Sequence, residues 1–220
     1  MIRTEPYMEL PVDADGFKGT IPSIPDLVPY TPFHYYHQRK LFIHNMGHAL
    51  TAYLGWLTGC ITIAQAIAVP EIRTLTERAM LQVGEALSRE CGVPMIELEA
   101  HIQDLLHRFA NRQLGDTVQR VGRDPMRKLL PDDRLVGSLL YTLSQGIEPF
   151  YIAAGIAAAF QFLPEDDSSA AELSEMVRRD GLDHVLTTYC QLTGSDTLDH
   201  WRKMIAAQYE LLGILQSKNK

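Results

Sequence analysis

The chain has 220 residues, and its 20 basic and 27 acidic side chains give a formal net charge of −7. This balance argues against a protein whose main ligand is nucleic acid, because neutralising phosphates requires a surplus of Lys and Arg. The longest nearly apolar run, Phe150 to Leu163, contains Gln161 and is shorter than the roughly 20 residues that a membrane-spanning helix needs. We therefore expect neither a nucleic-acid partner nor a membrane partner.

The three cysteines, Cys60, Cys91 and Cys190, are far apart in the chain, and no CxxC pair occurs. This pattern indicates neither a disulfide framework nor a thiolate zinc site. The first residues lack the basic segment and apolar core of a secretory signal. We expect a cytoplasmic protein.

Residues 1–33 hold six of the twelve prolines. Proline restricts φ and is excluded from helix interiors, so this segment is predicted to be an extended arm or connector. Ile2 to Leu10 could form an edge strand if another segment supplies the partner strand.

From residue 34 to residue 220 the pattern is helical, and we predict an all-α, multi-helix domain. Apolar residues at helical spacing, together with Gly and Pro at the ends, define most of the helices. The apolar segment that ends at Phe160 should be a central, buried helix, and Ser169 with Glu172 has capping-box spacing. Helices are predicted over residues 35–57, 62–69, 71–90, 94–108, 114–122, 131–145, 148–160 and 181–192, from residue 169 onward, and over 195–216.

Lys40, Asn45 and His48 are the densest polar group within an otherwise apolar helix. At about 100° per residue they would occupy one arc of about 140°, with His48 in the middle. They could supply a base, an amide and an imidazole to one pocket. The alternative is that Lys40 is a solvated surface residue and His48 a core histidine with its hydrogen bonds satisfied.

His44 and His48 are four residues apart, a spacing that can bind a divalent metal. The segment holds no carboxylate to complete a ligand set, and it lacks the glutamate of an HExxH motif. A metal-dependent helical enzyme that uses His44 and His48 is therefore an alternative, and our main interpretation expects no metal.

A second polar cluster lies between Arg120 and Arg134 and places five basic residues within an acidic protein. Such a segment would suit a polyol, carboxylate or phosphate ligand. The alternative is a solvated turn with surface pairs between Arg123 and Asp124 and between Arg127 and Asp133.

The segment from Lys40 to His48 resembles the K-x4-N-x2-H signature of the polyol-specific long-chain dehydrogenases. The mannitol-1-phosphate 5-dehydrogenases are the more similar group, because the helix continues in the same way to Gly55. The similarity runs from about residue 5 to about residue 165, and further similar blocks follow in order: Arg108-Phe-Ala-Asn111, Arg120-Val-Gly-Arg-Asp-Pro, Arg127-Lys-Leu, Asp133-Arg-Leu135 and Gly155–Phe160.

The resemblance implies a helical substrate domain similar to the C-terminal domain of 6-phosphogluconate dehydrogenase. Members of the family that this chain resembles interconvert a secondary alcohol of a sugar alcohol and the ketose, with NAD as cofactor. By the same resemblance Lys40 would be the catalytic base, and Asn45 and His48 would bind the reacting oxygen. Arg120 and Lys128 would bind distal hydroxyls or a terminal phosphate of the substrate.

No glycine-rich turn after a strand occurs, so we expect a substrate domain that lacks its own nucleotide-binding domain. It would act with a nucleotide-binding partner chain, or associate with itself, through the face near the arm and Lys40. A non-catalytic module that binds a polyol or sugar phosphate is the other alternative.

Overall fold

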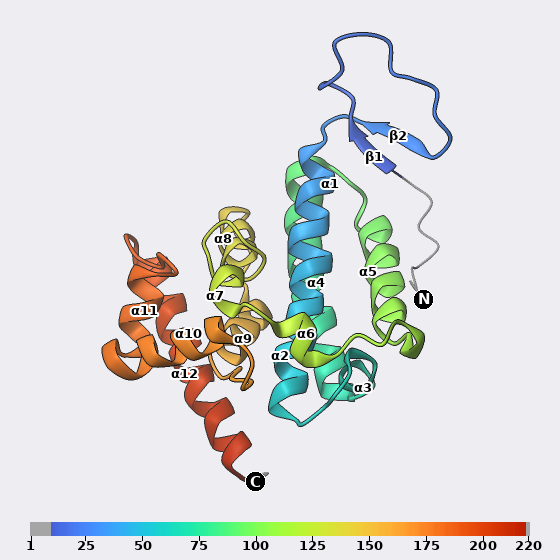
Figure 1. Ribbon diagram of the computed structural model, residues 1–220. Helices are drawn as coiled ribbons and strands as arrows, with labels where there is room; N and C mark the ends of the chain where they lie inside the picture. Colours follow the sequence, from blue (N-terminus) through green and yellow to red (C-terminus); the bar gives the residue numbers. More distant parts are fainter. Residues whose placement is uncertain (1–9, 219–220) are drawn as a thin grey trace.

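The computed structural model describes residues 10–218 and confirms the all-α class (Figure 1). Its two short strands, β1 (Leu10–Asp13) and β2 (Leu27–Tyr30), pair in parallel with Leu10 opposite Leu27. The predicted strand from Ile2 lies outside the described residues, apart from Leu10. The partner strand therefore comes from within the arm, and the pair lies beyond the end of α1.

A long helical rod runs through the middle of the domain, flanked on one side by α5 and on the other by α7 to α12 (Figure 1). The rod consists of α1 (His34–Gln38), η1 (Arg39–Asn45) and α2 (Met46–Leu57). Arg39 and Met46, at the two junctions, both have right-handed helical dihedrals, so the rod is continuous. The prediction of one α-helix over 35–57 is wrong in its middle, because η1 is a π-helix with wider turns.

The remaining helices follow the predicted order, with shorter bounds in several places. Thr62 forms a capping box with Gln65 at the start of α3, and Gly92 ends α4 in the left-handed conformation. Asp167, not Ser169, caps α10. The bounds are α3 (Ile63–Ile67), α4 (Pro70–Cys91), α5 (Met95–Phe109), η2 (Arg112–Leu114), α6 (Val118–Gly122), α7 (Pro125–Lys128), α8 (Val136–Ser144), α9 (Phe150–Ala159), α10 (Ser168–Asp180), α11 (Leu182–Thr188) and α12 (Asp196–Lys218).

The apolar helix α9 lies at the centre of the core, as predicted, and packs against α2, α4, α8 and α12. Gly155 permits the close approach to α2, because a Cβ there would lie 2.6 Å from Leu50 Cδ1. Within the described part of the chain, no helix is long and apolar enough to cross a membrane.

The segment from residue 116 to residue 122 is held in place by contacts with α2, with the residue before α3 and with Phe162. Thr117 forms an isolated antiparallel bridge with Thr62, just before α3. The buried Tyr53 hydroxyl of α2 donates a hydrogen bond of 2.9 Å to the Gly122 carbonyl, and α6 packs along α2. A Cβ on Gly122 would lie 2.7 Å from the ring of Phe162. These contacts place the second polar cluster beside His48.

Candidate functional site

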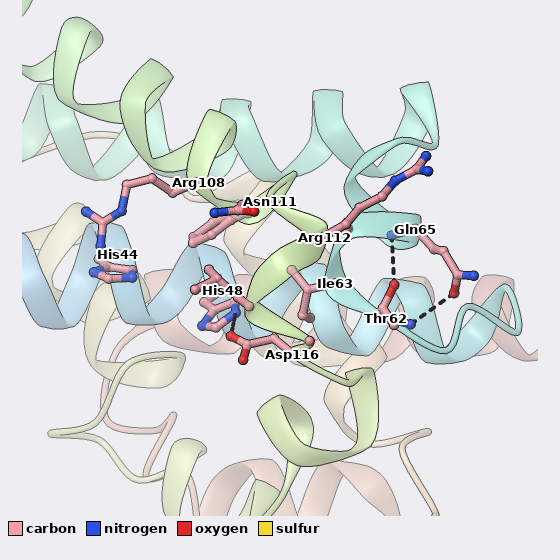
Figure 2. Close-up of a pocket in the computed structure, with 13 residues that line it drawn as sticks. His44, His48, Thr62, Ile63, Gln65, Arg108, Asn111, Arg112 and Asp116 are labelled. Carbon is pink, nitrogen blue, oxygen red and sulfur yellow. Dashed lines mark hydrogen bonds and ion pairs between the residues drawn. The ribbon is translucent and has the colours of Figure 1, made fainter. Parts of the chain in front are cut away.

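His48 projects from α2 between two hollows in the surface. The first, which we call the Arg108 hollow, has a volume of about 380 Å³ and is shown in Figure 2. The second, the Lys128 hollow, has a volume of about 660 Å³. The Arg108 hollow is lined by His44, His48, Thr62, Ile63, Ala64, Gln65, Arg108, Phe109, Asn111, Arg112, Leu114, Gly115 and Asp116. The Lys128 hollow is lined by His48, Arg120, Val121, Arg123, Asp124, Arg127, Lys128, Arg134, Asp166, Asp167, Ser168 and Ser169.

The His48 ring is fixed on one face and at one edge. The Phe109 ring stacks on it, with centroids 4.8 Å apart and planes inclined by 12°. Its Nε2 atom lies 3.5 Å from Asp116 Oδ2 (Figure 2). Burial, followed by the charge of nearby basic groups such as His44 and Arg120, lowers the pKa of His48 to about 3. The ring is therefore neutral at physiological pH, with one nitrogen as donor and the other as acceptor.

Lys128 is a buried cation in the wall of its hollow, with 4% of its surface exposed. Its ammonium group donates a hydrogen bond to the Arg123 carbonyl, and no described carboxylate lies within ion-pair distance. Burial is the largest cause that lowers its pKa, to about 8; Arg134 and Arg127 add to the effect, and Asp124 and Asp133 partly oppose it. Removing a charge from water without a counter-charge in direct contact is costly, so this position favours an anionic ligand.

The neighbouring arginines differ in their pairing. Arg127 contacts Asp124 at 3.0 Å and Asp133 at 3.3 Å, as the surface-turn alternative expects for the second pair. Arg120 pairs with Asp116, four residues earlier in the chain. The expected pair between Arg123 and Asp124 does not form among the described residues.

The structure brings three of the five predicted site residues together, because His48, Arg120 and Lys128 line one hollow. Lys40 and Asn45 lie on η1 and line neither hollow; Lys40 is exposed and Asn45 half-buried. The i→i+5 turns of η1 place them closer together around the axis than the roughly 140° of an α-helix. Lys40 thus lies on the surface two turns before His48.

Sequence reasoning missed Asp116, which contacts both His48 and Arg120. The available signal was its spacing of four residues from Arg120. The contact with His48, 68 positions earlier in the chain, depends on the tertiary structure.

The ring centroids of His44 and His48 lie 6.2 Å apart. Over residues 10–214, no group of three or more His, Cys, Asp or Glu side chains could hold a metal ion. The geometry therefore offers no support for the metal alternative.

The structure is thus a helical domain with polar side chains on its central rod. Residues 33–208 match the family described as the mannitol dehydrogenase C-terminal domain. The chain belongs to this family, which confirms the resemblance read from the K-x4-N-x2-H pattern.

Among curated relatives, the chain is similar to a mannitol-1-phosphate 5-dehydrogenase from Bacillus pumilus (strain SAFR-032), with 38% identity over 203 residues. The match covers 90% of this chain and 52% of the relative, so the chain spans about half the length of that protein. Among solved structures, it is similar to Pseudomonas fluorescens mannitol 2-dehydrogenase in a ternary complex with NAD and D-mannitol. That match has a TM-score of 0.67 and 21% identity, and covers 87% of this chain and 40% of the other; it shows the fold.

Proposed function

We propose that residues 34–220 form the substrate domain of an NAD-dependent dehydrogenase that interconverts a phosphorylated sugar alcohol and its ketose. Membership of the mannitol dehydrogenase family supports the reaction class. The name of the 38% identical relative supports the phosphorylated substrate. The observation that carries the proposal is that His48, Arg120 and the buried Lys128 line a single hollow.

The chemistry divides into a reacting end and a distal end. Hydride leaves an alcohol carbon readily when the hydroxyl proton is removed, and Lys40 would accept this proton. Asn45 and His48 would bind the reacting end of the substrate, and the Asn45 amide would donate to the reacting oxygen and stabilise the charge that develops on it. Neutral His48 can accept a hydrogen bond from a substrate hydroxyl through its unprotonated nitrogen.

The distal end would hold the phosphate. Lys128 provides a buried positive charge, and Arg120 and Arg123 line the same hollow. Hydrogen bonds between ionised groups of this kind are worth about 1.5–3 kcal/mol each. A phosphate monoester would therefore bind more tightly than the neutral polyol by about 10- to 100-fold.

NAD is the hydride acceptor in the proposed reaction. The described residues include no strand followed by a glycine-rich turn and a helix, the arrangement that binds a dinucleotide. We therefore assign NAD binding to a nucleotide-binding domain or partner chain that covers the face near the arm and Lys40. Such a cover would also remove the exposed Lys40 amine from water.

The test combines turnover with binding. The purified chain is mixed with NAD and mannitol 1-phosphate, with and without the nucleotide-binding half of the Bacillus pumilus relative, and NADH formation is followed. We expect turnover with the added half and none without it. Calorimetry on the chain alone should show tighter binding of mannitol 1-phosphate than of mannitol.

Phosphate-dependent binding with no turnover in the presence of any nucleotide-binding half would favour the non-catalytic binding module. Absence of both binding and turnover would refute the proposal.

A further inference from the structure

Asp116 contacts two of the proposed substrate-binding residues with its two carboxylate oxygens. Its Oδ2 lies 3.5 Å from His48 Nε2, and its Oδ1 accepts a hydrogen bond from the Arg120 guanidinium. It lies at the boundary of the two hollows, since His48 lines both and Arg120 lines the second. A single carboxylate thus connects the reacting end of the proposed site with the distal end.

The backbone around Asp116 is held in place. The Asp116 carbonyl accepts a hydrogen bond of 2.9 Å from the Ile63 amide, and the Val118 amide donates one of 2.9 Å to the Ile61 carbonyl. These two bonds join the segment to the start of α3 on either side of the Thr62–Thr117 bridge. The backbone that carries the carboxylate is therefore fixed relative to the start of α3.

The charges around His48 give this carboxylate a particular effect. His44, Arg108, Arg120 and Arg134 all disfavour the protonated ring. Asp116 is the described carboxylate within 4 Å of the ring. A carboxylate accepts hydrogen bonds but cannot donate them, so its place at Nε2 favours the neutral tautomer with hydrogen on Nε2.

We propose that Asp116 is a positioning residue that holds His48 in the Nε2–H tautomer and holds Arg120 beside it. The inference rests on the proposed function for its catalytic consequence. The separation of 3.5 Å is long for an N–H···O hydrogen bond, and such contacts commonly shorten when substrate binds. In this tautomer the acceptor is Nδ1, and the Phe109 ring stacks on one face of the imidazole.

Because Asp116 contacts both His48 and Arg120, Asp116→Asn should have a specific effect on the His48 tautomer. Asparagine has one acceptor and one donor in place of two acceptors. The Arg120 guanidinium can only donate and will take the amide oxygen, so the amide NH₂ faces His48 Nε2. That nitrogen must then be the acceptor, and the tautomer reverses to Nδ1–H.

The experiment measures the ring-nitrogen chemical shifts of His48 by NMR at neutral pH. A His48→Gln spectrum assigns its signals among the eight histidines. We expect Nε2–H in the unmodified chain, Nδ1–H in Asp116→Asn, and Nε2–H again in Asp116→Glu. The matched control is Glu175→Gln, which removes a carboxylate from an exposed pair with Arg178 on α10 and should leave the shifts unchanged.

With the nucleotide-binding half present, Asp116→Asn should lower kcat by about 10- to 100-fold, the size of loss found when the outer partner of a metal-bound histidine is removed. Asp116→Glu should restore most of the loss. An Nδ1–H ring in the unmodified chain, or unchanged shifts in Asp116→Asn, would overturn the inference. Tautomer reversal in a chain that shows no turnover with any partner would instead refute the proposed function and leave the tautomer assignment standing.

Discussion

Replacing Lys128 with methionine should separate the stability of this domain from its proposed ligand binding. The amine is 4% exposed and has no described carboxylate partner, and its pKa is lowered from 10.5 to about 8. One pKa unit corresponds to about 1.4 kcal/mol, so the buried charge costs the folded state roughly 3 kcal/mol at neutral pH. Methionine has a similar length and carries no charge.

Lys128→Met recovers only part of this free energy, because the Arg123 carbonyl loses its hydrogen-bond donor, at a cost of about 1 kcal/mol or more. We expect Lys128→Met to stabilise the free domain by roughly 1–2 kcal/mol, with Tm rising about 2–4 °C for each kcal/mol. The same variant should bind mannitol 1-phosphate about 10- to 100-fold more weakly, because it lacks the charged donor.

The pH dependence supplies an independent check. Between about pH 8 and 10.5 the unfolded chain holds a proton on Lys128 that the folded chain has released, so the stability of the unmodified chain rises with pH. The advantage of Lys128→Met should therefore shrink across this range. Thermal unfolding at several pH values and calorimetry measure both effects, with Lys203→Met on α12 as the exposed control. A variant that is less stable at pH 7 and binds the phosphate equally well would refute the reasoning.

Three further predictions concern Lys40 on the rod, Gly155 in the core and the stability of the fold at acidic pH. Lys40→Ala should abolish turnover of the reconstituted enzyme and change the free energy of unfolding by at most about 0.5 kcal/mol, because the side chain is exposed; near-native activity would exclude Lys40 as the base. Gly155→Ala should destabilise the fold by about 1–3 kcal/mol in denaturant titrations, since its Cβ would lie 2.6 Å from Leu50 Cδ1. Gly213→Ala, a helical glycine whose Cβ would meet nothing nearer than 3.7 Å, is the control and should be neutral or stabilising. Burial lowers the pKa of His101 to about 4, so stability should fall as pH drops from about 6.5 toward 4, when the unfolded chain gains a proton that the folded chain does not. His101→Gln should make that decline shallower, and an unchanged slope would contradict the assignment.

Much of the helix content could be predicted because its signals are local. Pro70 at the start of α4 and Gly92 at its end bound the helix through their own backbone preferences. The segment of α9 is apolar on nearly every side, which predicted a central helix, and α9 is buried against four other helices. Where a local signal had a competitor the prediction was wrong: Asp167 precedes Ser169 and caps α10 in its place.

The candidate site shows a different balance. The order of residues along the rod predicted the family and grouped Lys40, Asn45 and His48. The angles between these side chains, however, were calculated for α-helical turns. Whether a stretch of helix widens into π-turns depends on the packing around it, and η1 lies against α4 and α5. The angular arrangement of Lys40 and Asn45 was therefore not available from spacing.

By itself the sequence determined the helical class, the family and the identity of the polar groups, because these depend on residue type and short-range spacing. Tertiary structure decided which groups meet. Lys128 becomes a buried cation, and Asp116 comes to bridge His48 and Arg120, because the Tyr53 hydrogen bond and the Thr62–Thr117 bridge hold together segments that are 69 and 55 residues apart in the chain. Burial and contact over such separations arise when the chain packs, and they set the pKa values on which the chemistry depends.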